Sequence, residues 1–493
     1  MPAAQRRLVV LNWRDRRHPA AGAAELYCER AARELAGQGH PVVLVTSRPT
    51  GTAARERLDG YDVRRLGNWW SVYPLALLWL LKNRSTVGGV IDSQNGIPFF
   101  SPLVTRRDVP VVLLVHHVHQ ELFTRALHPL AARLARWLEG PASRRVYRRR
   151  TVVVLSPSAR TQVRRRLKFS GAIRVVPCGA DSAGVQSARS AAPRVVVVGR
   201  LTALKRLEWL IDAMAEVRVQ QPKAELHLVG DGPARQDLEE RARALGAPVV
   251  FHGRLSDAER DAMLGSAWLT VSASDGGDWA LSLIEANAAG VPAVARRTRG
   301  TTDAVRHGRT GWLVDGSSAE LGAAMAWALA VLADPGLAAR MADRARAWAA
   351  RFTWDRTAAG LLQALEFEGA RRQRLARGFA ERRTGNDLMV VLSVPRSAIS
   401  GQWESSRRAG DVWMSDGTTV RALLAGADEG DVSAILDRLE VDPGDPAVTV
   451  LVARHADLLG EWSDAEDVID LAEAVGRPVG VVTAEGRGGR RAA

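Results

Sequence analysis

Short β-branched runs alternate with helical patterns along the first 155 residues. The continuous apolar runs are Leu8–Leu11, Val42–Thr46, Val90–Asp92, Val109–Val115 and Val152–Leu155. Runs without regular polar interruption are typical of parallel strands that are buried on both faces of a sheet. Between the first two runs, Ala24–Ala36 has the spacing of an amphipathic helix and is followed by Gly37, a helix stop signal. The pattern predicts a Rossmann-like domain built from β-α-β units.

The same alternation restarts after Asp181–Pro193, an Ala- and Ser-rich stretch that is typical of a linker. The strands and helices predicted there are Val195–Val198, Leu207–Val217, Glu225–Val229, Ala234–Leu245, Val249–His252, Asp257–Gly265, Trp268–Ser272, Leu281–Ala289, Val291–Ala295 and Gly311–Val314. Helical segments Ser318–Leu332 and Gly336–Ala350 close the unit. We therefore expect two Rossmann-like domains, over residues 1–182 and 190–368, facing a cleft that holds the ligand.

The last hundred residues are predicted to form a smaller domain. Its expected strands are Leu388–Val394, Val412–Met414, Thr418–Leu424, Val448–Val452 and Val479–Val482, and its expected helices are Asp431–Leu439 and Asp464–Ala474. Ser415-Asp416-Gly417 is a hairpin signal. The predicted fold class is thus α/β, with two Rossmann-like domains and an accessory α+β domain over residues 386–493.

Charge is distributed unevenly between these parts. The chain of 493 residues has a net charge of +14, of which −9 falls on residues 386–493 and +23 on residues 1–385. A basic body favours an anionic partner, and phospholipid headgroups, nucleic acid and phosphorylated substrates all fit. A polyanion-binding protein is therefore one alternative, although the interleaved aromatic residues and recognisable modules of nucleic-acid binders are missing, so nucleic acid is not the expected partner.

Cysteine content and apolar segments bear on the compartment. Cys28 and Cys178 stand in separate predicted elements, so neither a disulfide framework nor a zinc site is expected. Elsewhere the longest apolar stretch, Trp69–Leu81, is shorter than the ~20 residues of a membrane-spanning helix. The run Leu8–Leu11 is too short for the core of a signal peptide. We expect a cytoplasmic protein.

The candidate chemistry begins after the first strand of the second domain. The run Val195–Val198 leads into Gly199-Arg200 and then Lys205, just before the next helical pattern. Ligands of α/β proteins bind at the carboxyl ends of the strands, and two cations beside the amides of a helix N-terminus form a clamp for a diphosphate. Taken alone, the pair is equally compatible with a solvated charged loop.

A second candidate segment is the Gly-rich stretch 274–280. It enters a helix near Ala280 and Leu281, whose free amides are placed to receive phosphate oxygens. Glu285 lies one turn further along and is placed to accept hydrogen bonds from ribose hydroxyls. Without the cationic loop described above, an exposed helix carboxylate would be the simpler interpretation.

Together these segments resemble family 4 of the retaining glycosyltransferases, which have the two-domain GT-B fold. The matching motifs of the second domain are Gly199-Arg200 with Lys205, Leu228–Pro233, Phe251–Leu255 and Leu281–Pro292. Those of the first domain are Asn12–Asp15, His18–Glu25, Gln94–Phe99 and Val115–His119. The resemblance covers roughly residues 5–365. Each motif is weak alone, but the combination is specific.

The resemblance implies a role for each matched residue of the second domain. Arg200 and Lys205 would hold the donor diphosphate and stabilise the leaving nucleotide. Glu285 would hold the ribose, and the backbone around His252 and Gly253 would meet the base. The implied reaction moves a hexosyl group from a UDP- or GDP-sugar to a glycan or lipid-linked acceptor, with retention of configuration and without a cofactor, in the synthesis of cell-surface polysaccharide or glycolipid.

In the first domain, the resemblance implies that the Gly22 loop approaches the diphosphate and acceptor, and that His116 is the active-site histidine. His116, His117 and His119 also suggest metal ligands. Enzymes of this kind neutralise the leaving group with basic side chains instead, so no metal is expected. Catalysis would be electrostatic, because the cations stabilise the charge that develops on the β-phosphate.

Two positions depart from the family pattern. Gly277 stands where a glutamate that contacts donor-sugar hydroxyls is usual, eight positions before Glu285, and Ala23 stands where a glycine is usual. Asp275 and Asp278 are the candidates to replace the missing carboxylate. The change at Gly277 leaves open a second interpretation, in which the chain binds a nucleotide sugar or acts as a partner subunit with weakened turnover.

An apolar helix stripe flanked by arginines indicates contact with a membrane surface. The stripe, at 4,3,4,3 spacing, is Phe123, Leu127, Leu130, Leu134 and Trp137. Basic clusters follow at 144–150 and 164–168. Together they would adsorb to anionic headgroups on the inner face of the cell membrane. In the alternative interpretation the stripe is core and the arginines form a solvated face.

The acidic C-terminal domain faintly resembles the later half of a diguanylate-cyclase domain. The resemblance rests on Gly410–Val412, the Asp416-Gly417 turn and Leu423–Glu429. Ser415–Thr419 stands where metal-binding carboxylates would be needed. We interpret the domain as an inactive interaction or regulatory module.

Overall fold

A computed structural model of the chain divides it into two compact units. The described residues are 6–19, 21–169, 171–181, 188–277, 279–376, 388–399, 412–425, 435–436, 439–441 and 448–454. Unit 1 contains the described residues of 1–179 and 353–463, and unit 2 contains those of 180–352. Among the described residues, unit 1 therefore combines two separate stretches of the chain, and unit 2 is the continuous segment between them.

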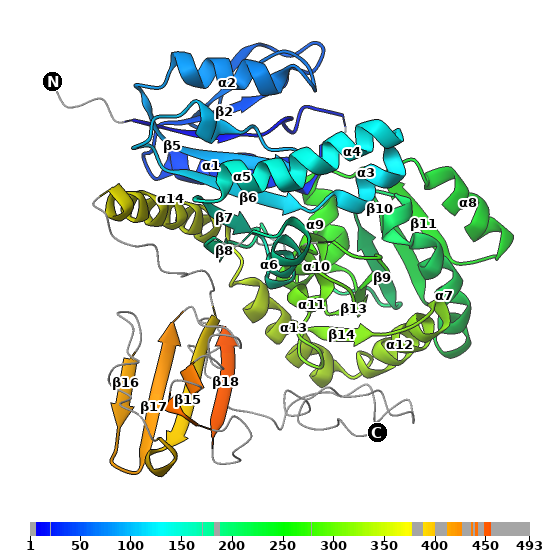
Figure 1. The fold of residues 1–493 in the computed structure, drawn as a ribbon. Helices are drawn as coiled ribbons and strands as arrows, with labels where there is room; N and C mark the ends of the chain where they lie inside the picture. Colours follow the sequence, from blue (N-terminus) through cyan, green and yellow to red (C-terminus); the bar gives the residue numbers. More distant parts are fainter. Residues whose placement is uncertain are drawn as a thin grey trace. The chain divides into compact units, whose positions relative to one another are not determined.

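Unit 1 is built on an eight-stranded sheet in the order β3-β4-β2-β1-β5-β6-β7-β8 (Figure 1). The strands are β1 (Arg7–Leu11), β2 (Val42–Thr46), β3 (Arg55–Leu58), β4 (Tyr61–Arg65), β5 (Val87–Asn95), β6 (Val111–His117), β7 (Thr151–Val154) and β8 (Ile173–Val175). Neighbouring strands pair in parallel, except that β3 is antiparallel to β4. β1, β2, β6 and β7 are almost wholly buried, as their uninterrupted apolar runs predict.

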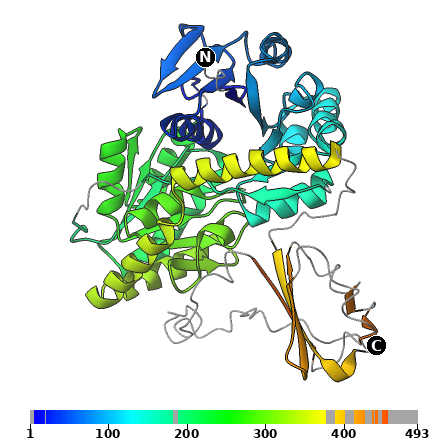
Figure 2. The same ribbon diagram turned by 90° about the vertical axis from the view of Figure 1, so that its left-hand side faces the viewer.

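Helices cover both faces of this sheet. α1 (Ala23–Gly37) and α14 (Trp354–Ala376) pack against each other, and α14 also contacts β6 and β7 (Figure 2). α2 (Val72–Lys82) and α5 (Ser143–Tyr147) contribute to a core that contains alternate side chains of β1 and β6. The remaining helical segments are α3 (Gln120–Ala126), α4 (Pro129–Trp137), α6 (Pro157–Gln162), the 3-10 turn η1 (Ser101–Leu103) and the π-helical turns η2 (Leu138–Ala142) and η3 (Val163–Leu167).

The structure differs from the predicted end of the second domain. α14 is tied to β7 of unit 1 through Glu368, whose buried carboxylate accepts hydrogen bonds from the backbone N (3.0 Å) and Oγ1 (2.9 Å) of Thr151. The guanidinium of Arg150 also approaches this carboxylate, at 3.4 Å. Residues 353–368 therefore belong to unit 1. Helical spacing shows which side of a helix is apolar, but it does not show which sheet that side covers.

Unit 2 is built on a six-stranded parallel sheet in the order β11-β10-β9-β12-β13-β14. Its strands are β9 (Arg194–Val198), β10 (Glu225–Val229), β11 (Val249–Gly253), β12 (Leu269–Ser272), β13 (Ala293–Arg296) and β14 (Gly311–Val314). Its helices are α7 (Leu207–Gln220), α8 (Arg235–Ala244), α9 (Asp257–Gly265), α10 (Leu281–Ala288), α11 (Thr301–Ala304), α12 (Ser318–Val331) and α13 (Pro335–Ala349), with the 3-10 turn η4 (Ala203–Lys205). The order places β9 and β12 side by side, so their following loops are neighbours at the carboxyl edge of the sheet.

The C-terminal part has a separate antiparallel sheet in the order β16-β17-β15-β18. Its strands are β15 (Leu388–Pro395), β16 (Val412–Ser415), β17 (Thr419–Ala425) and β18 (Thr449–Arg454), with the 3-10 turn η5 (Arg396–Ala398). Four predicted strands are therefore present. The predicted strand Val479–Val482 and helix Asp464–Ala474 lie outside the described residues, and the likeness to a diguanylate cyclase stays a prediction.

Within the described part of the chain, no single helix has both the length and the apolar composition of a membrane span. A bent pair, Ser318–Val331 with Pro335–Gln373, meets the two criteria only when its members are taken together.

Candidate functional site

The loop after β9 carries both predicted cations at the carboxyl edge of the unit 2 sheet (Figure 1). The chain leaves β9 through Gly199, at φ 154°, and passes Arg200 and η4 before α7 begins. Arg200 is exposed and forms no hydrogen bond or ion pair with any residue that the structure describes. Its guanidinium is therefore available to a ligand.

Lys205 folds back over the same loop. Its Cε lies 3.9 Å from the position that a Cβ on Gly199 would occupy. Burial lowers the pKa of the Lys205 ammonium, and no carboxylate among the described residues pairs with it. A partly desolvated cation without an acidic partner costs free energy in the free protein, and an anionic ligand would offset that cost.

Glycines hold the loops after β9, β10 and β11 in close contact. The amide of Gly199 donates to the carbonyl of Val229 (2.9 Å), and the amide of Gly230 donates to the carbonyl of Gly253 (2.7 Å). A Cβ on Gly230 would lie only 2.0 Å from the carbonyl oxygen of Gly199. The predicted Gly253 therefore joins the Arg200 loop through Gly230, and only glycine fits at that junction.

The His252 side chain is engaged with the neighbouring strand. Nε2 of His252 lies 2.9 Å from Nδ1 of His227, and the two rings stack with their centroids 5.1 Å apart. Nε2 of His227 contacts Glu225 at 3.2 Å. Burial lowers the pKa of both imidazoles, and the positive charge of Arg194 lowers them further. The imidazole of His252 is therefore engaged within unit 2, and the contact of its backbone with the nucleotide base stays a prediction.

α10 begins without a side-chain cap, and the phosphate contact at its N-terminus stays a prediction. Its N-cap residue Ala280 makes no side-chain hydrogen bond to the first turn, which starts at Leu281. One turn further, Glu285 is half-buried. Burial raises the pKa of Glu285 from 4.5 to about 7, and Arg260 partly opposes the shift. Asp278, also predicted at this site, lies outside the described residues.

The carboxylate of Asp275 is already paired with two arginines. It accepts hydrogen bonds from Nε of Arg206 (2.5 Å) and Nη1 of Arg296 (2.6 Å), and these cations lower the pKa of Asp275 although burial opposes them. Its backbone amide donates to the carbonyl of Leu204 (3.2 Å). Asp275 thus connects the loop after β12 to the Lys205 loop, and it is not a free substitute for the carboxylate missing at Gly277.

In unit 1, a buried carboxylate shapes the Gly22 loop. Glu25, 1% exposed, accepts hydrogen bonds from the Gly22 amide (2.6 Å), Nε of Arg14 (2.7 Å) and Nδ2 of Asn95 (3.4 Å). These contacts join three of the predicted motifs at the carboxyl ends of β1 and β5. Ala23, which replaces a usual glycine, is the first residue of α1.

His116 lies within β6 rather than directly after a strand, and it is 7% exposed. Its Nε2 is 3.7 Å from Sγ of Cys28, and its ring meets the Tyr27 ring edge to face at 5.4 Å. Both neighbours belong to α1, the helix that starts at the Gly22 loop. Unit 1 therefore brings the helix of the Gly22 loop against His116.

The neighbouring histidines are held by protein groups. Nδ1 of His119 is 3.0 Å from the carbonyl oxygen of His117, and the buried carboxylate of Glu139 accepts a hydrogen bond from the backbone N of His119 (2.6 Å). Among the residues that the structure describes, no three His, Cys, Asp or Glu side chains are grouped to hold a metal ion.

The predicted apolar stripe is largely exposed, so the interpretation of it as core is wrong for most of its members. It runs over two helices, α3 and α4, separated at Leu127 and His128. Leu130 is 70% exposed and Trp137 is 55% exposed. Further exposed apolar side chains come from α2 and the turn before it. We call the whole set the apolar surface of unit 1, and its members are Trp69, Trp70, Leu75, Leu78, Leu81, Leu122, Leu127, Leu130, Leu134 and Trp137.

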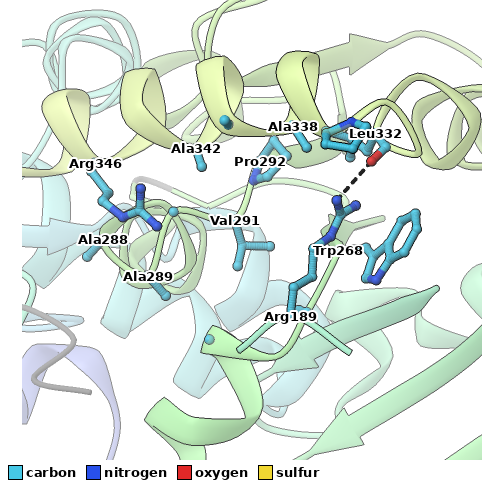
Figure 3. Close-up of a pocket in the computed structure, with 15 residues that line it drawn as sticks. Arg189, Trp268, Ala288, Ala289, Val291, Pro292, Leu332, Ala338, Ala342 and Arg346 are labelled. Atoms are coloured by element: carbon cyan, nitrogen blue, oxygen red, sulfur yellow. Dashed lines mark hydrogen bonds between the residues drawn. The ribbon is translucent and has the colours of Figure 1, made fainter. Parts of the chain in front are cut away.

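A hollow of about 440 Å³ opens at the opposite edge of the unit 2 sheet (Figure 3). Trp268 and Pro292 on its wall precede β12 and β13. The guanidinium of Arg189 lies 3.5 Å from the centroid of the Trp268 ring and donates to the carbonyl of Leu332 (2.8 Å). No predicted site residue lines this hollow, so it is separate from the candidate site.

Two family models match the chain. One, described as Glycosyltransferase Family 4, matches residues 24–183. The other, described as Glycosyl transferases group 1, matches residues 192–331. The two matches fall on the two Rossmann-like sheets.

Relatives and solved structures agree with these models. D-inositol 3-phosphate glycosyltransferase of Acidothermus cellulolyticus is 34% identical over 228 residues, which are 41% of this chain and 50% of that protein. GDP-mannose-dependent alpha-(1-6)-phosphatidylinositol monomannoside mannosyltransferase of Mycolicibacterium smegmatis is 29% identical over 348 residues, which are 66% of this chain and 82% of that protein. The chain thus spans half the length of the first relative. Sucrose-phosphate synthase from Thermosynechococcus elongatus has a similar fold, with a TM-score of 0.59 at 21% identity, covering 76% of this chain and 100% of that one.

The two Rossmann-like sheets and the similarity to solved glycosyltransferase structures define the two-domain GT-B fold. The chain belongs to glycosyltransferase family 4, as the resemblance of its motifs predicts.

Proposed function

We propose that the protein transfers a hexosyl group from a UDP- or GDP-sugar to a glycan or lipid-linked acceptor, with retention of configuration and without a metal or cofactor. The observation that carries the proposal is the pair Arg200 and Lys205. Both cations stand at the carboxyl edge of a parallel sheet without an acidic partner among the described residues. The relative from Mycolicibacterium smegmatis, named as GDP-mannose-dependent, supports a nucleotide-sugar donor. We place the reaction in the synthesis of cell-surface polysaccharide or glycolipid.

Arg200 and Lys205 act on the leaving group. As the bond between the anomeric carbon and the β-phosphate oxygen breaks, negative charge grows on that oxygen. Cations fixed beside it stabilise this charge more in the transition state than in the ground state. Lys205 is well suited to this task, because its burial weakens competing hydration of the ammonium.

Glu285 and α10 orient the donor. The ionised Glu285 carboxylate accepts hydrogen bonds from the ribose hydroxyls, and the uncapped amides at Leu281 face the phosphates. The acceptor attacks from the face that the leaving group occupies, so the mechanism requires no protein nucleophile. In unit 1, the Gly22 loop and His116 serve the acceptor side.

Transfer and binding assays test the proposal. Thermal unfolding with UDP, GDP and their sugars identifies the base, since a ligand of the native state raises its stability. Arg200→Ala and Lys205→Ala should each lower turnover by about 10²–10³-fold. Lys223→Ala is the matched control, because Lys223 is exposed at the opposite edge, before β10. Turnover that survives both changes would refute the assignment.

A second candidate function is nucleotide-sugar binding with weakened turnover. Gly277 favours it, because the carboxylate usual at that position is missing and Asp275 is already held by Arg206 and Arg296. The two functions separate when binding and transfer are measured on the same sample. Donor binding that depends on Lys205, without transfer or donor hydrolysis, would identify this second function.

The apolar surface of unit 1 supports a peripheral contact with an anionic membrane. Tryptophans and leucines exposed on surface helices are typical of interfacial segments. Exposed arginines accompany them on α4 and α5, namely Arg133, Arg136, Arg144 and Arg145. Apolar side chains would enter the headgroup region while the guanidinium groups meet lipid phosphates. This contact would hold the protein on the cytoplasmic face, where a lipid-linked acceptor is presented.

Vesicle flotation tests the membrane contact. The protein should float with phosphatidylglycerol vesicles, less so at high salt, and replacement of Leu130, Leu134 and Trp137 by serine should abolish flotation. Val219→Ser is the control, since Val219 is 77% exposed on α7 of unit 2. Unchanged flotation of the triple variant would refute the contact.

A further inference from the structure

On the loop between β13 and α11 (Figure 1), Arg299 is the third cation at the carboxyl edge of unit 2, after Arg200 and Lys205, that has no acidic partner among the described residues. Its Nε is buried without a hydrogen-bond partner, and its guanidinium forms no ion pair with any residue that the structure describes. A guanidinium that lacks both a hydrogen-bond partner for its buried Nε and an ion pair is stabilised when an anion binds to it.

The guanidinium faces the loop after β12. A Cβ on Gly276 would lie 3.8 Å from Nη2 of Arg299, and apart from the chain neighbours no other atom of the described residues would lie within 4 Å of it. A Cβ on Gly277 would have no atom within 4 Å. Among the residues that the structure describes, no side chain fills the space at Gly277, next to the Gly276 backbone that Arg299 faces.

Tertiary contacts connect this space with the Lys205 loop. Thr298 Oγ1 donates to the carbonyl of Ser274 (3.3 Å), which fixes the Arg299 loop against the loop after β12. Asp275 in turn connects that loop to η4, through its amide and the Leu204 carbonyl (3.2 Å). Arg299 thus belongs to the same group of loops as the two cations assigned to the diphosphate.

The positive charge of the three unpaired cations, Arg200, Lys205 and Arg299, exceeds the negative charge of a nucleoside diphosphate. The pyrophosphate of such a sugar carries two negative charges, which Arg200 and Lys205 balance. Arg299 remains, and the open position at Gly277 removes the nearest place from which a glutamate side chain could pair with it. Since no carboxylate of the described residues pairs with Arg299, a negative charge on the ligand would balance its guanidinium.

We propose that Arg299 binds a carboxylate on the sugar of the donor, so that the donor is a nucleoside diphosphate uronic acid. This inference rests on the proposed function and names the substrate class of the same site. Gly277 leaves room for the carboxylate, and the planar guanidinium takes it through two parallel hydrogen bonds. A neutral hexose would leave Arg299 unpaired.

Competition binding tests the proposal. The probes are UDP, UDP-glucose and UDP-glucuronic acid, with GDP, GDP-mannose and GDP-mannuronic acid as the second series. The wild type should bind the uronic acid about 10- to 100-fold more tightly than the matching neutral sugar. Arg299→Gln should remove this preference and change the affinity for the nucleoside diphosphate alone by less than about 3-fold. The Gly277→Glu variant should also lose the preference for the uronic acid, because the carboxylate of the new side chain would pair with the Arg299 guanidinium in place of the ligand.

Arg297→Gln is the matched control. Arg297 lies two residues away on the same loop and pairs with Asp315 (2.9 Å), so its variant should keep the preference. A wild type without preference for the uronic acid overturns the proposal. So does an Arg299→Gln variant that loses affinity for the nucleoside diphosphate itself, since Arg299 would then belong to the diphosphate clamp. If no nucleotide binds at all, it is the proposed function that fails.

Discussion

Replacing Glu285 by glutamine should make the free protein more stable at pH 8 and weaken its hold on nucleotide. Burial raises the pKa of Glu285 from 4.5 to about 7. Because the folded state has the higher pKa, the stability from the bound proton is complete below pH 4.5 and is lost as the pH rises to about 7. The ionised side chain then costs about 3 kcal/mol at pH 8, an upper limit because it is only half-buried. Glutamine carries no such cost.

Urea unfolding at pH 5 and pH 8 measures the effect. Glu285→Gln should raise the free energy of unfolding by up to about 3 kcal/mol at pH 8 and by far less at pH 5. The same variant should bind UDP or GDP about 10- to 100-fold more weakly, because a charged acceptor of the ribose hydroxyls is lost. Glu216→Gln, at an exposed position of α7, is the control. An equal change at both pH values, or a loss of stability at pH 8, would refute the reasoning.

Two further changes test packing, one beside the Arg200 loop and one between α14 and β7. Gly230→Ala should lower the free energy of unfolding by about 2–4 kcal/mol, because its Cβ would meet a backbone carbonyl at 2.0 Å. Gly246→Ala, with φ 56° and open space, should cost only about 1 kcal/mol; equal losses in urea unfolding would contradict the steric argument. Glu368→Ala should cost about 3 kcal/mol by leaving the donors of Thr151 unpaired. Thermal unfolding beside the exposed control Glu366→Ala checks this, and similar midpoints for the two variants would speak against it.

Most strands could be predicted because they are buried on both faces. β2, for example, is buried along its whole length and has the predicted bounds, Val42–Thr46. The β3–β4 hairpin was missed although Asp59-Gly60 in its turn is a strong signal. The inward-facing side chains of β4 include Arg65, which is fully buried and paired with Asp15 at 2.6 Å. A charge in an inward position conceals the apolar alternation from which a half-buried strand is predicted.

The candidate site was predictable only where its residues follow strands in local motifs. Arg200, Lys205 and Glu285 were found in this way, and their catalytic roles stay predictions. Arg299 stands in no local motif, because its relation to Gly277 arises when the loops after β12 and β13 pack together. Asp275 was predicted as a candidate sugar ligand because the sequence does not show that it pairs with Arg206, which lies far from it along the chain.

Unit 1 cannot finish folding before the ribosome has synthesised unit 2, because part of unit 1 follows unit 2 in the sequence. Residues 1–179 emerge first, but α14, which covers α1, follows only after all of residues 180–352. At typical synthesis rates this takes on the order of 10–30 s, during which unit 2 is free to fold by itself. Until then the side of α1 that receives α14 stays uncovered and open to chaperones. A gene fragment that stops at residue 352 should therefore give aggregated protein, whereas one that extends through residue 376 should give soluble protein.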